Sequence, residues 1–287
     1  MNAITRHLRT IPIRGDSHDL HKEEPDGGDP PMKKTTFLSF GAGIDTTAIL
    51  HIPEIMERVN FVMFADTGVE NPETYSYMEK YSIPFITQDL KLPFVVVRGC
   101  EKADGVIVDN LEEACLRWKI IPSRVLRHCT DKFKMRPMGK YIADHYPGQE
   151  IEAIVGIAWD EVHRMNNGRW NGYTPIYPLV DRKLTRDGCK RIIREAGWPV
   201  PPKSGCAICP FQRKGQWKAL RHNHPHIFAR AIKLEENGSR FPDFLLSNFG
   251  IPLREVDVKL GIDLSAFDDS EGSERAEDDE CGGVCMT

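Results

Sequence analysis

The feature that most constrains this chain is a glycine turn between two apolar runs, within residues 37–50. The run Phe37–Phe40 leads into the turn, and a polar group then opens a renewed apolar pattern: Gly41, Gly43, Asp45, Thr46 and Thr47. This order is typical of a strand, a tight turn and the start of a helix. Glycines let backbone N–H groups approach a ligand, and the helix start adds partial positive charge. The stretch predicts a site for a phosphate or pyrophosphate; the alternative is an ordinary turn whose glycines serve packing.

Two common phosphate-binding loops are excluded by the residues of this turn. No Gly-Lys-Ser/Thr follows the glycines, so the turn is not a Walker A loop. The third glycine of the dinucleotide-binding fingerprint is missing, and Asp45 lies inside the turn.

The composition indicates a cytoplasmic protein without a membrane partner. No run of about 18 apolar residues exists, and no apolar stretch follows the N-terminal arginines, so neither a membrane span nor a secretory signal is expected. In a reducing compartment, the eight cysteines are expected to be metal ligands or redox thiols rather than disulfides. The net charge of −4 is split, because residues 268–280 carry eight acids and one arginine, which leaves +3 elsewhere, as suits an anion-binding protein.

The order of the predicted elements indicates an α/β fold with a mostly parallel sheet and helices on both faces. Strands are expected near 35–40, 61–65, 83–87, 94–97 and 151–158, with polar residues such as Asp66 after them, where ligands of parallel sheets bind. Helices are expected near 72–81, 110–119, 187–197 and 212–237. We divide the chain into a disordered leader (1–31), a nucleotide-binding domain (32–181), a helical, cysteine-bearing extension (182–265) and an acidic tail (266–287).

Three motifs in this order resemble the phosphoadenosine phosphosulfate reductase family. The turn at 41–46 resembles the pyrophosphate-binding PP-loop, Asp66-Thr-Gly the second motif, and Gly156 with Glu161 and Arg164 the third. Tyr177-Pro-Leu-Val resembles the next strand of the family. The match runs from about Thr35 to about Trp217.

The resemblance implies an adenine nucleotide alpha-hydrolase-like fold that binds ATP or an adenylated sulfate, with or without magnesium. The residues it assigns to phosphate and nucleotide binding are Gly41, Gly43, Asp45, Thr46, Thr47, Asp66 and Gly156. It also implies that Asp45 acts in catalysis and that Arg164 meets an anionic substrate. The sequence departs from the PP-loop at Gly41, where a serine is usual, and at Ala42, where a glycine is usual.

The cysteines form a second group of candidate site residues. Cys129 lies in a basic segment, and Cys206 and Cys209 form a Cys-x-x-Cys turn, which is a ready metal chelate. Nearby lysines and arginines are expected to favour thiolates. The arrangement resembles reductase-like proteins thought to carry a four-iron four-sulfur cluster; structural zinc and plain thiols are the alternatives.

The tail carries a last pair of cysteines. Glu280-Cys281-Gly resembles the motif that bears the nucleophilic cysteine of sulfonucleotide reductases. In this reading Cys281 attacks sulfur and Cys285 resolves the product as a disulfide, with a thioredoxin-like protein as reductant. The alternative is a spare pair of cysteines on a disordered tail.

Three functions follow from these features. The first is a sulfonucleotide reductase-like enzyme with an iron–sulfur cluster. The second is an ATP-dependent sulfur transferase that adenylates a tRNA base or a DNA phosphate, releases pyrophosphate and replaces AMP by sulfur. The third is a non-catalytic, zinc-stabilised module that binds a nucleotide or nucleic acid.

Overall fold

A computed structural model describes residues 33–124, 127–165, 172–238, 245–247 and 250–260 of the chain. Its centre is a five-stranded sheet in the order β3-β2-β1-β6-β7, in which all neighbouring strands are parallel. The strands are β1 (Lys34–Ser39), β2 (Phe61–Asp66), β3 (Phe94–Arg98), β6 (Glu150–Val155) and β7 (Thr174–Ile176). A separate antiparallel hairpin joins β4 (Glu101–Ala103) and β5 (Val106–Val108).

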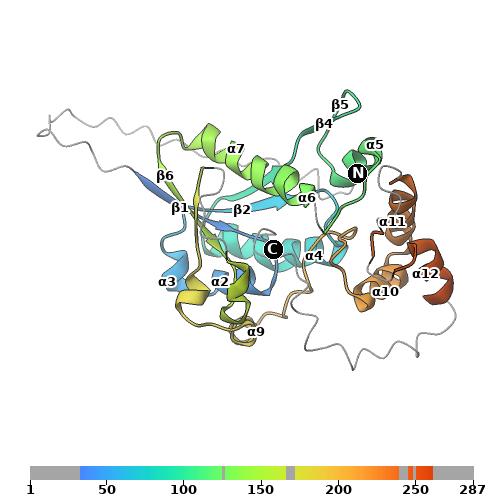
Figure 1. Cartoon of the computed structure of the whole chain (residues 1–287). Coiled ribbons are helices and arrows are strands. Elements are labelled where there is room, and N and C mark those ends of the chain that lie inside the picture. The colour runs from blue at the N-terminus through green and yellow to red at the C-terminus, as the bar shows by residue number, and fades with distance from the viewer. Residues whose placement is uncertain (1–32, 125–126, 166–171, 239–244, 248–249, 261–287) are drawn as a thin grey trace, which may run out of the picture.

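Helices cover both faces of the sheet, as the sequence predicted. Figure 1 shows α7 over one face and α2, α3 and α9 over the other. The helices flanking the sheet are α2 (Ile44–Leu50), α3 (Pro53–Met56), α4 (Pro72–Tyr77), η1 (Met78–Ser82), η2 (Phe85–Asp89), α6 (His128–Thr130), η3 (Asp131–Met135), α7 (Arg136–His145), η4 (Trp159–Arg164), α8 (Pro178–Asp181) and α9 (Arg186–Glu195). The predicted α/β fold class is therefore confirmed.

The central strand explains why the first apolar run is continuous. In β1, Phe37 pairs with Phe61 of β2 and faces the core under α7, whereas Leu38 faces the core under α2 and α9. A strand between two parallel neighbours, with helices on both faces, has no solvent side, so its side chains are apolar on both faces. Both residues are fully buried.

The C-terminal extension forms a third core at one end of the sheet. It contains α10 (Lys214–Asn223), α11 (Pro225–Asn237) and α12 (Leu253–Leu260), which gather beside α5 (Leu111–Trp118) in Figure 1. Trp217 and Phe228 are buried there, as predicted, together with Ala207 and Ile208 of the Cys-x-x-Cys turn. This core brings the cysteine-bearing segment against the α/β body.

Two local predictions are wrong. Residues 83–87 are helical, because the helix that begins at Pro72 continues to Asp89 through the wide turns of η1 and η2. These turns accommodate Pro84, which has no N–H to donate. A strand was also expected at Tyr177–Val180. The strand in this region, β7, ends before it at Ile176, and Pro178 begins the short helix α8.

Other predictions concern residues that the structure does not describe. The leader (1–31) and the tail from residue 266, with Cys281 and Cys285, lie outside the described residues. Among the helices that are described, none is long and apolar enough to cross a membrane.

Candidate functional site

The strand order places a site at the carboxyl ends of β1 and β6. From β1 the chain proceeds to β2 and β3 on one side, whereas β6 and β7 lie on the other. Ligands of open parallel sheets bind where the strand order reverses in this way. The glycine turn follows β1, and the segment from Gly156 to Arg164 follows β6, so two of the three predicted motifs meet at this point.

The glycine turn has the backbone of a tight loop leading into a helix. Gly43 is the N-cap of α2 in an extended conformation, and the backbone N–H of Thr47 donates to its carbonyl at 2.9 Å. Ala42 has φ +57°, in the left-handed region that favours glycine. An alanine is strained in this conformation.

Asp45 faces a group of charged side chains beyond β6. Glu161 accepts hydrogen bonds from Arg164 through one carboxylate oxygen and from Arg186 through the other, the latter at 2.6 Å. The backbone N–H of Arg186 also donates to Asp160 at 2.9 Å. Asp45 is 6% exposed, and within the described part of the chain its Oδ1 has no hydrogen-bond partner. Burial, and then the charge of Glu161, raise the pKa of Asp45 to about 7, although both arginines oppose the rise.

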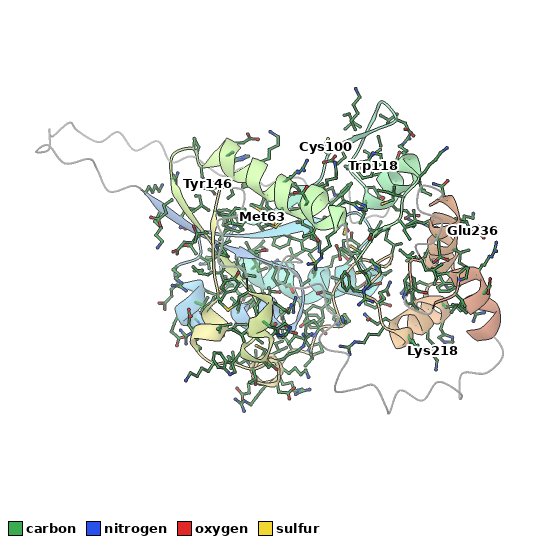
Figure 2. All side chains as sticks on the ribbon, in the orientation of Figure 1. Met63, Cys100, Trp118, Tyr146, Lys218 and Glu236 are labelled. Atoms are coloured by element: carbon green, nitrogen blue, oxygen red, sulfur yellow. The ribbon has the colours of Figure 1, made fainter. Side chains whose placement is uncertain are left out.

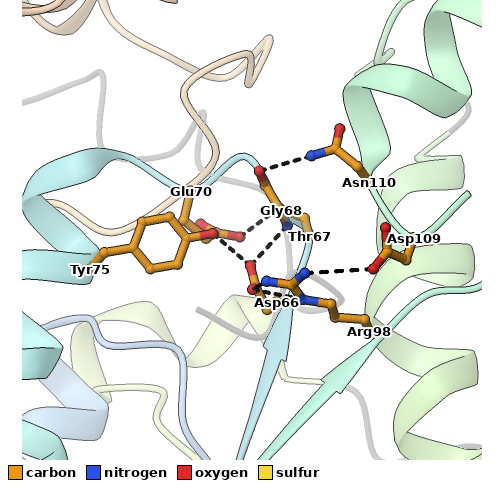
Figure 3. Close-up of polar contacts among 8 residues, drawn as sticks. All are labelled: Asp66, Thr67, Gly68, Glu70, Tyr75, Arg98, Asp109 and Asn110. Carbon is orange, nitrogen blue, oxygen red and sulfur yellow. Dashed lines mark hydrogen bonds and ion pairs between the residues drawn. The ribbon is translucent and has the colours of Figure 1, made fainter. Parts of the chain in front are cut away.

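The Asp66 carboxylate is bound by neighbouring residues and does not face the cavity of the glycine turn (Figure 3). Its Oδ1 accepts from the Tyr75 hydroxyl at 2.6 Å and from the Gly68 N–H at 2.8 Å. Its Oδ2 accepts from Arg98, with Nε at 3.0 Å, and Arg98 also meets Asp109 at 3.6 Å. The carboxylate is 2% exposed and fully engaged, so it fixes the loop after β2 and leaves no oxygen for a nucleotide.

Gly156 and the two threonines also have packing roles. A Cβ on Gly156 would lie 2.9 Å from the backbone nitrogen of Thr46 and 2.6 Å from its methyl group. Only glycine therefore lets the end of β6 approach the start of α2 this closely. Thr46 donates to the Gly43 carbonyl at 3.3 Å, and Thr47 is fully buried.

The Cys-x-x-Cys turn is held against the loop that follows β2. The backbone N–H of Asn71 donates to the Gly205 carbonyl at 2.9 Å, and that of Ala207 to the Val69 carbonyl at 2.7 Å. The turn itself closes with a hydrogen bond from the Cys209 N–H to the Cys206 carbonyl at 3.0 Å. These bonds bring the thiols to the same edge of the sheet as the glycine turn.

Cys206 lies among polar groups, and its burial favours the protonated thiol. Its sulfur lies 3.1 Å from the Thr67 hydroxyl and donates to Glu70 at 3.4 Å. Burial, and then Glu70, raise the pKa of this thiol well above its ordinary value. Lys134, whose Nζ is 4.0 Å from Glu70, opposes the rise. The expectation that basic neighbours favour a thiolate is therefore wrong at Cys206, because desolvation outweighs them.

One cavity, with an empty volume of about 1120 Å³, joins the glycine turn to the thiols. Gly43 and Asp45 line one part of it, and Cys129, Cys206 and Cys209 line another. Among the described residues that line it, Asp45 is the one acidic side chain, and five are cationic: Arg127, Lys134, Arg164, Arg186 and Lys203. Such a balance favours an anionic ligand.

The remaining predicted residues lie elsewhere. Gly41 lines a smaller pocket of about 320 Å³, together with Phe64 and Met138. Thr46, Thr47, Asp66 and Gly156 are absent from the lining of both cavities. Sequence reasoning missed Arg186, which reaches the site because the first turn of α9 lies beside η4.

The three thiols share a cavity wall without forming a compact chelate. Among the residues that the structure describes, no three His, Cys, Asp or Glu side chains come close enough together to hold a metal ion. The donor types suit a soft metal or an iron–sulfur cluster. A cluster attaches its cysteines to different irons, so its ligands lie farther apart than those of one tetrahedral ion.

Comparison with known proteins gives one distant relative. No family model matches the chain. The chain is 23% identical over 225 residues to Uncharacterized protein MJ0066 of Methanocaldococcus jannaschii, a match that covers 69% of this chain and 41% of that protein. The chain thus spans less than half the length of the relative.

Proposed function

We propose that this chain is an enzyme similar to phosphoadenosine phosphosulfate reductases, which binds an adenine nucleotide and carries out sulfur reduction or transfer. The observation that carries the proposal is the single cavity lined by both the glycine turn and three cysteines. A nucleotide-binding turn alone would fit many enzymes, and three thiols alone would fit a structural metal site. Their common cavity favours chemistry in which a phosphate or sulfate group meets sulfur.

The glycine-turn end of the cavity is suited to the charged part of the nucleotide. Arg164 and Arg186 line it, and the Glu161 carboxylate between them holds their guanidinium groups in place. These groups would neutralise charge that develops on a leaving pyrophosphate or sulfite. The Oδ1 of Asp45 has no hydrogen-bond partner among the described residues and is suited to hold magnesium bound to the phosphates, an ion that lowers their repulsion toward a nucleophile.

The thiol end is suited to hold an iron–sulfur cluster through Cys129, Cys206 and Cys209. When bound by three cysteines, such a cluster supplies an iron without a protein ligand, to which a sulfur atom can bind. The chain's own contribution is to hold the three thiols beside the nucleotide, and Glu70 and Thr67 fix the position of Cys206. This chemistry requires reduced thiols and so fits a cytoplasmic protein.

Two reactions suit this cavity. In reduction, a thiolate attacks the sulfur of an adenylated sulfate, and the nucleotide leaves; the thiosulfonate that forms then releases sulfite when a second thiol forms a disulfide. In transfer, an acceptor oxygen attacks the α-phosphate of ATP, pyrophosphate leaves, and sulfur then displaces AMP.

The proposal is tested by anaerobic reconstitution with iron and sulfide, followed by parallel assays of sulfite and pyrophosphate release. We expect a brown protein with about four irons per chain, in accord with a four-iron cluster. Sulfite release from an adenylated sulfate would select reduction, and pyrophosphate release from ATP would select transfer. A colourless, zinc-loaded protein that releases neither product would overturn both reactions.

A further inference from the structure

One threonine on the wall of the cavity has a hydroxyl that the protein does not satisfy. Thr130 lines the cavity, directly after Cys129 in the chain, and is 2% exposed. Within the described part of the chain, its Oγ1 makes no hydrogen bond. Buried hydroxyl groups are usually bonded, because burial removes their bonds to water. Since Thr130 lies on a cavity wall, a group bound in the cavity is the candidate partner.

The helix that carries Thr130 places it at the thiol end of the cavity. Residues 128–145 form one continuous helix through α6, η3 and α7. Lys134 follows Thr130 by four residues, so the two lie on about the same face, and both line the cavity. Lys134 Nζ is 4.0 Å from Glu70, which in turn accepts from Cys206 at 3.4 Å. Thr130 therefore shares its part of the wall with the thiols.

A different face of the same helix packs against α5 and fixes its orientation. The Trp118 ring, labelled in Figure 2, lies 6.2 Å from the His128 ring and 6.3 Å from the Phe133 ring. Cys115 Sγ of α5 is 3.7 Å from His128 Nε2. These contacts belong to the third core, so the helix start has little freedom to rotate. A threonine is also stiff about its first side-chain bond, which limits the directions that the Thr130 hydroxyl can take.

The chemistry of the neighbouring groups indicates what this hydroxyl binds. Cys129, Cys206 and Cys209 line the same cavity. Sulfur atoms of a group held by thiolates carry negative charge, so they accept hydrogen bonds and donate none. The Thr130 hydroxyl has one hydrogen to donate, and a bond to a charged acceptor is stronger than a bond between neutral groups. The hydroxyl is thus suited to donate to sulfur.

We propose that the Thr130 hydroxyl donates a hydrogen bond to a sulfur atom of the iron–sulfur cluster held by the three cysteines and raises the reduction potential of that cluster. The inference rests on the proposed function, because it concerns the group that the thiols hold. The reduced form carries one more negative charge than the oxidised form, so a donated hydrogen bond stabilises it more. Thr130 acts through a sulfur atom and is not an iron ligand.

Thr74 on α4 is a matched control for Thr130. Each is the third residue of its helix, and its N–H donates to the carbonyl three residues earlier: Thr74 to Asn71 at 2.9 Å and Thr130 to Arg127 at 3.0 Å. Thr74 is 1% exposed, and its Oγ1 also has no partner among the described residues. It is absent from the lining of both cavities. An unpartnered hydroxyl alone therefore does not indicate a ligand, and the inference for Thr130 depends on its place beside the thiols.

The test measures the midpoint potential of the full chain after anaerobic reconstitution with iron and sulfide, by dithionite titration followed by electron paramagnetic resonance. Thr130→Val keeps the shape of the side chain and removes the hydroxyl. At a fixed potential, it should shift the ratio of reduced to oxidised cluster roughly tenfold toward the oxidised form, which corresponds to a midpoint about 59 mV lower. Thr130→Ser, which keeps a hydroxyl, and Thr74→Val should both have the wild-type potential.

Urea denaturation of the metal-free, reduced chain provides a second measurement. Thr130→Val should be at least as stable as the wild type, because the hydroxyl that it removes makes no bond within the described protein. Lower stability of Thr130→Val would show that the hydroxyl serves the fold, and would overturn the proposal. An unchanged potential in Thr130→Val, as expected if the hydroxyl binds only water, or an equal shift in Thr74→Val would overturn it as well.

These results separate failure of this inference from failure of the proposed function. An unchanged potential in a Thr130→Val protein that still releases sulfite or pyrophosphate overturns the role of Thr130 alone. A wild-type chain that forms no cluster overturns both the cluster and the role of Thr130. A lowered potential in Thr130→Val, together with a wild-type chain that releases neither product, supports the role of Thr130 and overturns the proposed reactions.

Discussion

At the scale of single residues, burial of the Asp45 carboxylate lowers the stability of the folded protein at high pH, while the proposed function requires that carboxylate. Its pKa of about 7 lies well above the ordinary value near 3.8, mainly because of burial. The folded state therefore binds the proton more tightly than the unfolded state, and stability is lost as pH rises from about 4 to about 7. A shift of this size corresponds to at most about 4 kcal/mol, at about 1.4 kcal/mol per pKa unit.

We therefore predict that Asp45→Asn raises the unfolding free energy at pH 8 by about 2–4 kcal/mol and has little effect near pH 4. Nucleotide binding should weaken by at least about tenfold, because a carboxylate oxygen suited to magnesium is lost. Urea denaturation at both pH values, with ATP titration at pH 8, checks both effects. Lower stability of the variant than of the wild type at pH 8 would contradict the prediction.

A second residue-scale prediction concerns Ala42, at φ +57°. The left-handed conformation costs a non-glycine residue about 1–2 kcal/mol, whereas glycine loses about 0.5–1 kcal/mol of chain entropy on folding. Ala42→Gly should therefore stabilise the protein by up to about 1 kcal/mol in urea denaturation. Ala48→Gly, within α2, is the control and should destabilise it. A loss of stability in Ala42→Gly as large as in the control would show that the turn carries no strain.

The positions of site residues could be predicted better than their orientations. Asp45, Arg164 and Gly43 line the cavity because they follow strands whose carboxyl ends meet, which strand order alone implies. Asp66 follows a strand in the same way, yet its carboxylate turns to Tyr75 and Arg98. No sequence pattern distinguishes these two outcomes, because the difference arises from partners distant in the chain. Arg186 was missed for the same reason.

At the scale of elements, the Asp66 network fixes the loop between β2 and α4. Asp66→Asn should lower the unfolding free energy by roughly 2–3 kcal/mol, since it removes one charge of a largely buried pair with Arg98. Asp109→Asn is the matched control. Asp109 meets the same guanidinium at 3.6 Å but its side chain is 62% exposed, so the loss should stay below about 0.5 kcal/mol. Chemical denaturation of both variants checks the difference, and equal losses would contradict it.

The elements that sequence reasoning placed correctly are those with strong local signals. Helix α5 has Asn110 at its N-cap, where the side chain accepts from the Glu113 N–H at 3.1 Å, and β1 and β2 are continuous apolar runs. The strand prediction for residues 83–87 was wrong because Ile, Phe and Thr favour strands. In the structure Met78, Ser82 and Ile86 are buried at a spacing of four, so burial on one helical face overrides the local preference.

At the scale of the whole molecule, the candidate site depends on contact between the sheet and the C-terminal extension. Backbone bonds at Gly205 and Ala207 join the extension to the loop after β2, and His224 Nε2 lies 2.6 Å from Glu73 at the start of α4. The sequence predicted the glycine turn and the thiols separately. Their common cavity follows from this packing, which joins segments more than 130 residues apart and has no local signature.

The common cavity predicts that a bound nucleotide changes the reactivity of the cysteines, which tests whether the glycine turn and the thiols belong to one site. A nucleotide bound at Gly43 and Asp45 should hinder access to the thiols at the other part of the cavity, so ATP or an adenylated sulfate should slow alkylation of Cys129 and Cys209 by at least about threefold, in proportion to the bound fraction of the protein. Cys206 should react slowly with or without nucleotide, because the raised pKa of its thiol leaves little thiolate.

The measurement is iodoacetamide labelling of the metal-free, reduced chain, with each cysteine followed by mass spectrometry. Cys100 is the internal control, since it is exposed and absent from the cavity lining, and its rate should be the same with and without nucleotide. Protection of Cys129 and Cys209 without protection of Cys100 would place nucleotide and thiols in one site. Alkylation rates of Cys129 and Cys209 that saturating nucleotide leaves unchanged would separate the two sites and remove the basis for sulfur chemistry on a bound nucleotide.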